Sequence, residues 1–178
     1  MRYDGRPLQG SYRGTVPDHR GRFLREIQNW SDEDLERTHD YIQWLFPLAE
    51  PSGFNIDAPI LDDGTVSQFR ANADLRRRLQ TSLIRMLSFY GLEIHGTVPL
   101  TVTRAPNSGE RIENWLTPSN HNHLRITRIL ESLKLLGLGE QARAFFDCLA
   151  DIYRVESVKA TPRISEETFT FWQAAAHG

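Results

Sequence analysis

Apolar residues recur at helical spacing along most of this chain. The clearest case runs from Asp74 to about Tyr90, where leucines at positions 75, 79 and 83 and apolar residues at 86, 87 and 90 share one helical face. Gly91 follows, at the position where a residue in the left-handed conformation commonly ends a helix. The pattern therefore predicts an amphipathic helix that buries its leucine face.

Four more segments carry the same period. They are Arg22–Asn29, Asn120–Leu136, Gly139–Arg154 and a last helix that follows Ser165 and carries Phe169, Trp172 and Ala176. Ser165 is a favourable first cap, because its hydroxyl can accept a hydrogen bond from a free backbone N–H of the first turn. These segments predict a chain dominated by helices.

The densest apolar run, Tyr41–Leu48, contains a single amide, Gln43. We expect a helix that begins at Ser31, whose hydroxyl accepts from the N–H of Asp34, and that continues through this run until Pro47 ends it. Because such a helix end is apolar on nearly all sides, other helices must cover it. The run therefore marks the centre of the core.

The remaining segments predict loops and a small amount of sheet. Prolines between residues 47 and 59 indicate a loop, Thr65 with Gln68 resembles a capping box that opens a further turn, and the alternation of Val98, Leu100 and Val102 allows a short β-hairpin near 94–104. The predicted fold is mainly α: a single-domain, irregular, orthogonal array of about five to seven helices with long, unequal loops.

Composition bounds the organisation and the partners. Residues 1–20 are rich in glycine, proline and arginine with few large apolar groups, so we expect a flexible basic arm before a helical domain over residues 21–178. Apolar residues make up 39% and charged residues 25% of the chain, as in an ordinary globular protein. The net charge of −2 supplies no overall attraction to nucleic acid or to anionic membrane, and neither is expected as a partner.

The chain has one cysteine and no long apolar run. Cys148 excludes an intrachain disulfide and falls on the apolar side of a predicted helix, which indicates a buried, inert thiol. No segment approaches the roughly 20 apolar residues of a membrane span, and the start of the chain lacks a signal-peptide core. We expect a soluble, cytoplasmic protein without membrane insertion.

Three stretches together resemble the conserved domain of the opioid growth factor receptor family. They are His39 with Tyr41–Leu48 and Glu50–Pro51; Met86–Leu87 with Phe89–Gly91; and Asn114–Trp115 followed by His121–Asn122 and Leu124–Leu130. The resemblance extends from about Trp30 to Leu149. It implies a mainly helical domain and, in the animal members, a receptor for an enkephalin-type peptide that is unrelated to the seven-helix opioid receptors; it does not imply an enzyme. The short N-terminal region and the absence of a long C-terminal extension suggest a compact member from outside animals.

Two interpretations are open for three aromatic residues and one amide. In the first, a peptide-binding groove is lined by Tyr41, Gln43, Trp44 and Trp115, because pockets of this kind combine aromatic walls with a few amides. In the other they pack in the core, which is the more frequent fate of tryptophan in an apolar run. If Gln43 is buried, its amide needs partners, for which the backbone of the Pro47–Pro51 loop is the nearest candidate.

A second candidate site lies at the start of the Asn120–Leu136 helix. Free N–H groups and the helix dipole favour an anion there. The side chains available to it are His121 and Asn122, with Arg125 and Arg128 one turn apart. In the alternative, Asn120 only caps the helix, and the arginines pair with acids such as Glu113 or Glu131.

Other chemistry is poorly supported. His121 and His123 are two residues apart, so on a helix they diverge by about 200 degrees and cannot share a metal. His39 and Asp40 are adjacent in sequence and diverge too, and no serine or cysteine motif supplies a nucleophile. The Arg125–Arg128 segment resembles a DNA-reading helix only weakly, because no helix–turn–helix spacing precedes it.

We therefore expect a non-catalytic ligand- or protein-binding domain with no cofactor. Its partner is a peptide or protein, and its binding surface forms where Tyr41–Leu48 meets the start of the Asn120–Leu136 helix. The alternative is an enzyme or sensor that binds a phosphorylated or carboxylated small molecule at that helix start.

Overall fold

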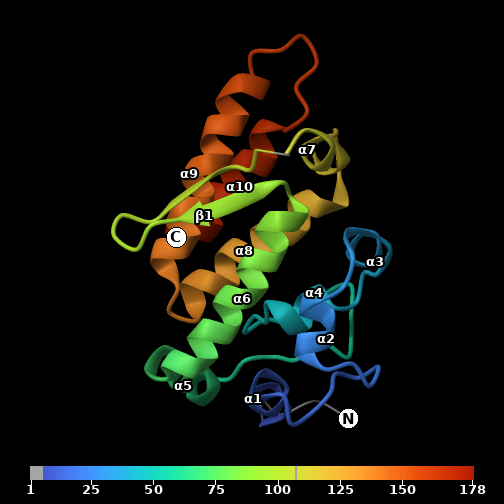
Figure 1. Ribbon diagram of the computed structural model, residues 1–178, viewed down its shortest axis with the longest axis vertical. Coiled ribbons are helices and arrows are strands. Elements are labelled where there is room, and N and C mark those ends of the chain that lie inside the picture. The colour runs from blue at the N-terminus through green and yellow to red at the C-terminus, as the bar shows by residue number, and fades with distance from the viewer. Residues whose placement is uncertain (1–5, 107) are drawn as a thin grey trace. The chain divides into compact units, whose positions relative to one another are not determined.

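The computed structural model describes residues 6–106 and 108–178, which form ten helices and one two-stranded antiparallel sheet (Figure 1). In chain order they are α1 (Arg6–Arg13), α2 (Leu24–Gln28), α3 (Asp32–Arg37), α4 (Ile42–Leu45), α5 (Asp63–Ala71), α6 (Ala73–Phe89), β1 (Leu92–His95), β2 (Thr101–Arg104), α7 (Gly109–Trp115), α8 (His121–Leu135), α9 (Gly139–Glu156) and α10 (Glu166–His177). The mainly helical class and the hairpin are confirmed. Short helices, which a periodicity argument detects poorly, raise the helix number above the expected five to seven.

The described chain divides into two compact units. The first runs from α1 to Arg85 and includes residues 135–137, and the second comprises residues 86–134 and 138–178. Each unit has its own buried core and is described by itself.

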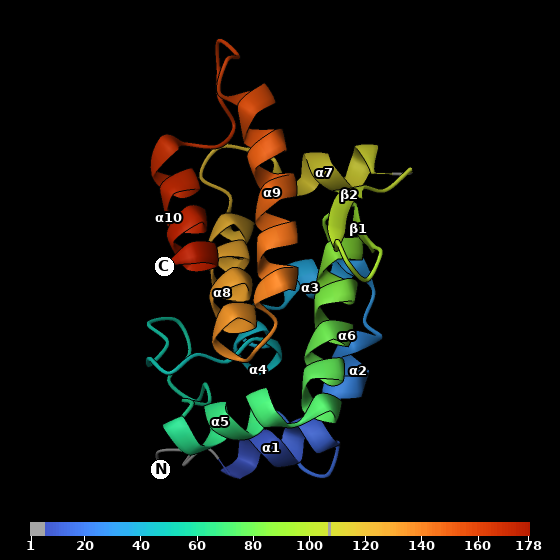
Figure 2. The ribbon, with the colours of Figure 1, turned by 90° about the vertical axis from the view of Figure 1, so that its left-hand side faces the viewer.

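In the first unit, helix α1 occupies eight of the twenty residues that were expected to form a flexible arm. Leu8 and Tyr12 lie four residues apart on one face and are fully buried. The Tyr12 ring meets the Phe69 ring of α5 edge-on at 4.8 Å, and its hydroxyl donates to the backbone oxygen of Leu45. Figure 2 shows α1 alongside α5. The burial of Leu8 and the contacts of Tyr12 with Phe69 and Leu45 stabilise this short helix. Residues 1–5 of the expected arm lie outside the described residues.

The single helix expected from Ser31 to Phe46 is instead two short helices, α3 and α4. Ser31 caps α3 as predicted, since its hydroxyl accepts from the N–H of Asp34 at 3.1 Å. The backbone turns extended at Thr38 (φ −95°, ψ 133°), which ends α3. Asp40 then uses its backbone oxygen and its carboxylate in contacts with distant residues, described below. Those tertiary contacts stabilise a break that the local pattern did not reveal.

The start of α5 also differs from the prediction. Asp62, rather than Thr65, is the first cap: its Oδ1 accepts from the backbone N–H of Thr65 at 2.6 Å. A hydrogen bond of this kind also lowers the pKa of the Asp62 carboxyl. Aspartate is among the strongest N-terminal caps, so α5 begins three residues earlier than Thr65 with Gln68 suggested.

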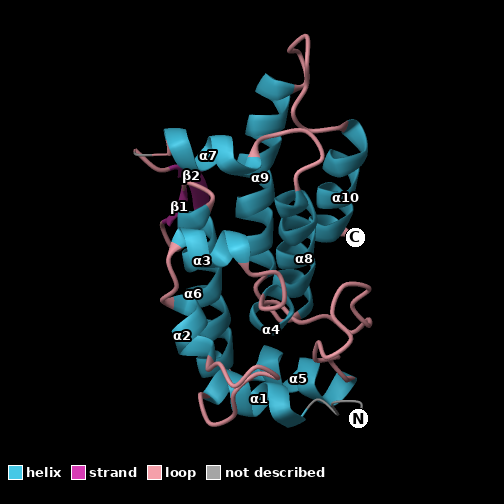
Figure 3. Ribbon diagram, turned by 90° about the vertical axis from the view of Figure 1, so that its right-hand side faces the viewer, coloured by secondary structure: helices cyan, strands magenta, loops and turns pink. Residues whose placement is uncertain are grey.

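The second unit is built on α8, α9 and α10 (Figure 3), and strand β2 of the hairpin packs against α9. β1 and β2 pair in a register that places Ile94 opposite Val102. Between α9 and α10, the ring of Phe169 stacks on that of Tyr153 with centroids 4.1 Å apart. The predicted helices over α6, α8, α9 and α10 are all confirmed to within a few residues.

Candidate functional site

The residues expected to form one binding surface belong to two different units. Tyr41, Gln43 and Trp44 lie in the first unit, whereas Trp115, His121, Asn122, Arg125 and Arg128 lie in the second. Each group is therefore considered within its own unit.

The three residues of the first unit are core residues. Tyr41 and Trp44 have no exposed surface, and Gln43 is 3% exposed. Gln43 Oε1 has no hydrogen-bond partner among the described residues, so this half of the amide does not bond to the Pro47–Pro51 backbone as expected. Of the two readings of this segment, the structure adopts core packing.

Trp115 is also an interior residue. Its Nε1 donates to the backbone oxygen of Tyr90 at 2.9 Å, and its own backbone oxygen lies 3.1 Å from Nε2 of His123. Trp172 donates in turn to the backbone oxygen of His123 at 3.0 Å. Burial lowers the pKa of His123, outweighing the opposite effect of the Trp115 hydrogen bond, so the imidazole is held neutral. These residues tie α7, α8 and α10 together.

At the start of α8, Asn120, Asn122 and Arg125 are engaged by groups of the same helix. Asn120 Oδ1 accepts from the backbone N–H of Asn122 at 2.9 Å, the capping role considered above. Asn122 is fully buried, and its Oδ1 accepts from Nη1 of Arg125 at 3.1 Å, with Arg125 only 6% exposed. Arg128 is half-buried; burial lowers its pKa, and the nearby Glu131 opposes that shift. Arg125 therefore has an internal partner, but this partner is the amide of Asn122 and not one of the acids that the alternative named; Glu113 pairs with Arg163 instead.

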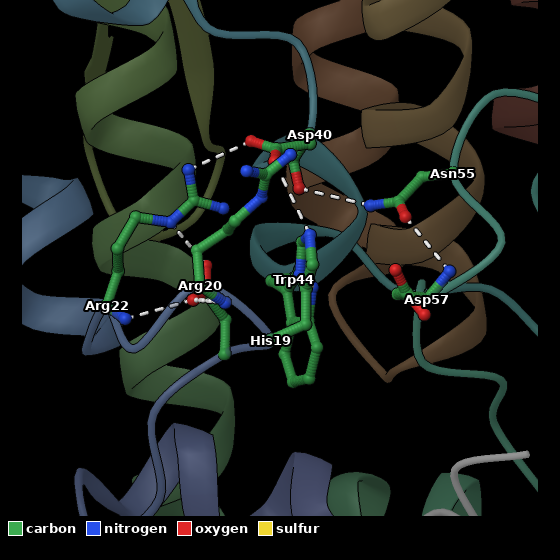
Figure 4. A network of polar contacts seen from close by, with 8 residues as sticks. His19, Arg20, Arg22, Asp40, Trp44, Asn55 and Asp57 are labelled. Atoms are coloured by element: carbon green, nitrogen blue, oxygen red, sulfur yellow. Dashed lines mark hydrogen bonds and ion pairs between the residues drawn. The ribbon is translucent and has the colours of Figure 1, made fainter. Parts of the chain in front are cut away.

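The first unit contains a polar network that the sequence did not single out. Arg22 reaches two carboxylates: Nε donates to Oδ2 of Asp18 at 2.6 Å, and Nη1 donates to Oδ1 of Asp40 at 2.9 Å (Figure 4). Asp18 is 5% exposed and also accepts from the backbone N–H groups of Arg20 and Arg22. The Arg22 guanidinium lies 5.4 Å from the centre of the Trp30 ring. The network fixes the segment before α2 against Asp40.

His19 links this network to the core. Trp44 Nε1 donates to Nδ1 of His19 at 3.1 Å, and Nε2 of His19 lies 3.4 Å from Oδ2 of Asp40 (Figure 4). Because Nδ1 must accept, the bound tautomer carries its proton on Nε2, facing the carboxylate. The two rings are nearly parallel, 15° apart. Trp44 therefore has a positioning role in the interior.

Asp40 is held ionised and engaged. Burial by itself would raise the pKa of this carboxyl, but the hydrogen bond from Arg22 and the charges of Arg22 and Arg20 outweigh burial and lower it. A shallow hollow of about 480 Å³ opens beside it, lined by Arg20, Arg22, Arg37, Thr38, His39 and Asp40. Its arginines pair with Asp18, Asp34 and Asp40, so the cluster neutralises itself. This arrangement suits a structural tie better than an anion site.

The loop between α4 and α5 is fixed by contacts at its base. Leu48 and Ile60 form an isolated bridge, and the N–H of Leu61 donates to the oxygen of Leu48 at 2.9 Å. Asn55, in the middle, donates from Nδ2 to the backbone oxygen of Asp40 at 3.3 Å (Figure 4). We call residues 48–61 the Leu48–Leu61 loop.

The tip of this loop exposes two large apolar side chains. Phe54 is 85% and Ile56 is 97% exposed. The backbone that carries them is held from within: Ser52 Oγ accepts from the N–H groups of Phe54 and Asn55, and Asn55 Oδ1 accepts from that of Asp57. A short, internally bonded loop with a closed base that displays apolar groups is typical of a contact surface.

Sequence reasoning missed this loop because its prolines and glycine marked it only as a connection. Two signals were present. Phe54 and Ile56 stand two residues apart among turn-forming residues, and no lysine or arginine occurs between Arg37 and Arg70. The network around Asp18 was missed because the composition of residues 1–20 predicted a flexible arm.

In residues 6–106 and 108–178, no three His, Cys, Asp or Glu side chains are placed to hold a metal ion together. Within these same residues, no helix is long and apolar enough to cross a bilayer.

Comparison with known proteins identifies a family. Residues 16–173 match the family model described as the opioid growth factor receptor conserved region. The opioid growth factor receptor of Homo sapiens is 46% identical over 121 residues, which cover 66% of this chain and 18% of that protein. Opioid growth factor receptor-like protein 1 is 44% identical over 117 residues in Xenopus tropicalis and 39% over 130 residues in Mus musculus.

These matches cover most of the present chain but a small part of each relative. They correspond to 64% and 71% of this chain, and to 22% and 27% of the two receptor-like proteins. The chain thus spans only about a fifth to a quarter of the length of these relatives. No solved structure matches it.

Proposed function

We propose that this chain, which belongs to the family of the opioid growth factor receptor conserved region, is a non-catalytic domain that binds a peptide or a protein. The matched relatives are named as a receptor and as receptor-like proteins. The observation that carries the proposal is the Leu48–Leu61 loop, whose tip exposes Phe54 and Ile56 on a fixed backbone. We assign the contact surface to this loop.

The loop is suited to binding because its conformation is already ordered. A partner that contacts Phe54 and Ile56 removes their apolar surface from water, which is the main favourable term in protein association. The hydrogen bonds of Ser52 and Asn55 hold the backbone before the partner arrives. Less conformational entropy is then lost on binding, and affinity rises accordingly.

Two of the binding residues predicted from the sequence, Tyr41 and Trp44, have a positioning role in this proposal. Tyr41 and Trp44 are buried immediately before the loop, and Trp44 orients His19 against Asp40. Asp40 in turn accepts the hydrogen bond from Asn55. In this proposal the apolar run positions the loop, while the loop itself meets the partner.

A catalytic role has weaker support. Asp40 is engaged by two arginines and a histidine and is therefore no free base. Arg125 donates to Asn122. Burial raises the pKa of Cys148 to about 11, so that thiol is protonated near neutral pH and is a poor nucleophile. A single buried thiol also fits a reducing, cytoplasmic location.

The test is a selection of peptides on the purified chain. A phage-displayed library of random peptides is selected on the wild type after depletion on the variant Phe54→Ser/Ile56→Ser. Recovered peptides are synthesised, and the shift that each produces in the melting temperature is measured, because a ligand that binds only the folded state raises it. The matched control is Val98→Ser, which removes another apolar side chain that is 93% exposed.

We expect peptides that raise the melting temperature of the wild type and of Val98→Ser but not of Phe54→Ser/Ile56→Ser. Peptides that stabilise all three proteins equally would move the binding surface away from the loop. Recovery of no peptide that stabilises the wild type would contradict the proposed function.

A further inference from the structure

We propose that the partner of the Leu48–Leu61 loop is a cationic protein segment, one in which lysine or arginine side chains flank an apolar residue. The inference rests on the proposed function and adds the chemistry of the partner. Its starting point is a charge pattern: residues 38–69 contain Asp40, Glu50, Asp57, Asp62 and Asp63 but no lysine or arginine. In a chain with 21 basic residues, the segment that carries the loop therefore contributes acidic side chains and no lysine or arginine.

Most of these acids face solvent around the loop. Glu50 and Asp57 lie on either side of the exposed tip, and Asp62 and Asp63 follow its closing residue. Asp40 is the exception, since its carboxylate is neutralised by Arg22 and its neighbours. Among the described residues, the carboxylates of Glu50, Asp57 and Asp63 take part in no hydrogen bond or ion pair. Their charge is therefore available to a partner.

The apolar tip and the acidic residues around it contribute to binding in different ways. Phe54 and Ile56 supply surface that is buried on contact, which gives affinity. The carboxylates at the edge of that contact attract a partner of opposite sign and speed its approach, and they disfavour partners of like sign. A segment that combines an apolar side chain with neighbouring lysines or arginines satisfies both.

The same charges argue against other occupants of this surface. An anionic membrane and nucleic acid both carry the sign of Glu50 and Asp57, so they are repelled. A second copy of the chain that docked loop to loop would bring the same carboxylates together without a compensating cation. Inorganic anions are disfavoured for the same reason.

The experiment uses three fluorescently labelled peptides of equal length. Each carries leucine at the same positions, and the positions between are filled with lysine, serine or glutamate. Binding to the wild-type chain is measured by fluorescence anisotropy at low and at high salt. We expect the lysine peptide to bind at least about tenfold more tightly than the serine peptide, the glutamate peptide to bind most weakly, and high salt to reduce these differences.

Variants separate the two contributions. Phe54→Ser/Ile56→Ser should lower the affinity of the chain for the lysine peptide and for the serine peptide alike, by about tenfold or more. Glu50→Lys and Asp57→Lys should each lower the affinity for the lysine peptide severalfold and raise the affinity for the glutamate peptide. The control is Asp147→Lys, which changes the net charge by the same amount at an exposed position of α9. This variant should leave the affinities for both peptides unchanged. Circular dichroism establishes that each variant is folded.

The outcomes distinguish this inference from the proposed function. If the serine or glutamate peptide binds as tightly as the lysine peptide and still depends on Phe54, the charge inference is wrong and the binding domain stands. If the binding of no peptide depends on Phe54 or Ile56, both the charge inference and the proposed function of the loop are wrong. Binding of the wild type to phosphatidylserine vesicles, lost in Phe54→Ser/Ile56→Ser, would identify a membrane surface instead and overturn the inference.

Discussion

The side-chain amide of Asn55 donates a hydrogen bond to the backbone oxygen of Asp40, which lies 15 positions earlier in the chain, at a distance of 3.3 Å. The contact joins the two polar features of the first unit. On one side is the network of Asp40 with Arg22 and His19, and on the other is the loop that exposes Phe54 and Ile56. The position of the loop therefore depends on a residue whose carboxylate is fixed elsewhere.

Asn55→Ala should loosen the Leu48–Leu61 loop without unfolding the unit. The change removes the bond to Asp40 and the bond that Asn55 Oδ1 accepts from the N–H of Asp57, at a cost of about 1 kcal/mol each in the free energy of unfolding. We expect faster amide hydrogen exchange at residues 53–58, measured by mass spectrometry. The control is Asn114→Ala, an exposed asparagine of α7. Unchanged exchange in the loop would show that Asn55 does not hold it.

His19→Ala should destabilise the first unit through Trp44. The buried Nε1 of Trp44 loses its acceptor, and an unsatisfied buried donor costs about 1–3 kcal/mol of unfolding free energy. The measurement is urea-induced unfolding followed by tryptophan fluorescence. His95→Ala, at an exposed histidine of β1, should change the free energy by no more than about 0.5 kcal/mol. Equal effects of the two variants would refute the structural role of His19.

Gly91→Ala should destabilise the second unit. Gly91 has φ of +73°, and an added Cβ would lie 3.0 Å from the backbone oxygen of Ser108. The left-handed conformation alone costs a residue with a side chain about 1–2 kcal/mol, and the close contact adds to it. Gly53→Ala provides the control, since an added Cβ meets nothing within 4 Å there. Thermal unfolding that ranks Gly53→Ala as the less stable variant would contradict this account.

Acid should destabilise the second unit partly through Glu156. Hydrogen bonds from Arg163 and Lys159 lower the pKa of this buried carboxyl to about 2, against the effect of burial. Its folded-state pKa lies below that of the unfolded chain, about 4.3, so its stabilisation is present above the unfolded value and lost as pH falls toward 2. Glu156→Gln should cost about 2 kcal/mol at neutral pH and flatten the fall in unfolding free energy between these pH values. Chemical denaturation across that range measures both, and an unaltered slope would count against the assignment.

Inorganic phosphate should not stabilise the chain through the start of α8. Arg125 is buried and donates to Asn122, so no open pair of arginines awaits an anion there. Thermal unfolding in increasing phosphate should give the same melting-temperature shift for the wild type and for Arg128→Ala. A larger shift in the wild type would revive an anion site at this helix start.

Local patterns predicted the long helices well. The leucines of α6, the apolar stripe of α8 and the Ser31 and Ser165 caps act over a few residues, and the structure contains each of them. Predictions failed where a distant residue decided the outcome. The break after α3 depends on contacts of Asp40 with Arg22 and Asn55, and the helical state of α1 depends on Phe69. Neither partner is visible in the local sequence.

The sequence by itself determined the mainly helical class, the family resemblance, the buried thiol of Cys148 and the acidic character of residues 38–69, because each depends on residue type and short-range spacing. Tertiary structure alone decided that Tyr41, Gln43, Trp44 and Trp115 are interior residues and that Phe54 and Ile56 are exposed. Burial is a property of how segments pack, and apolar residue types are compatible with either outcome. Which of them face solvent follows from hydrogen bonds such as that of Asn55 with Asp40, which join positions far apart in the chain.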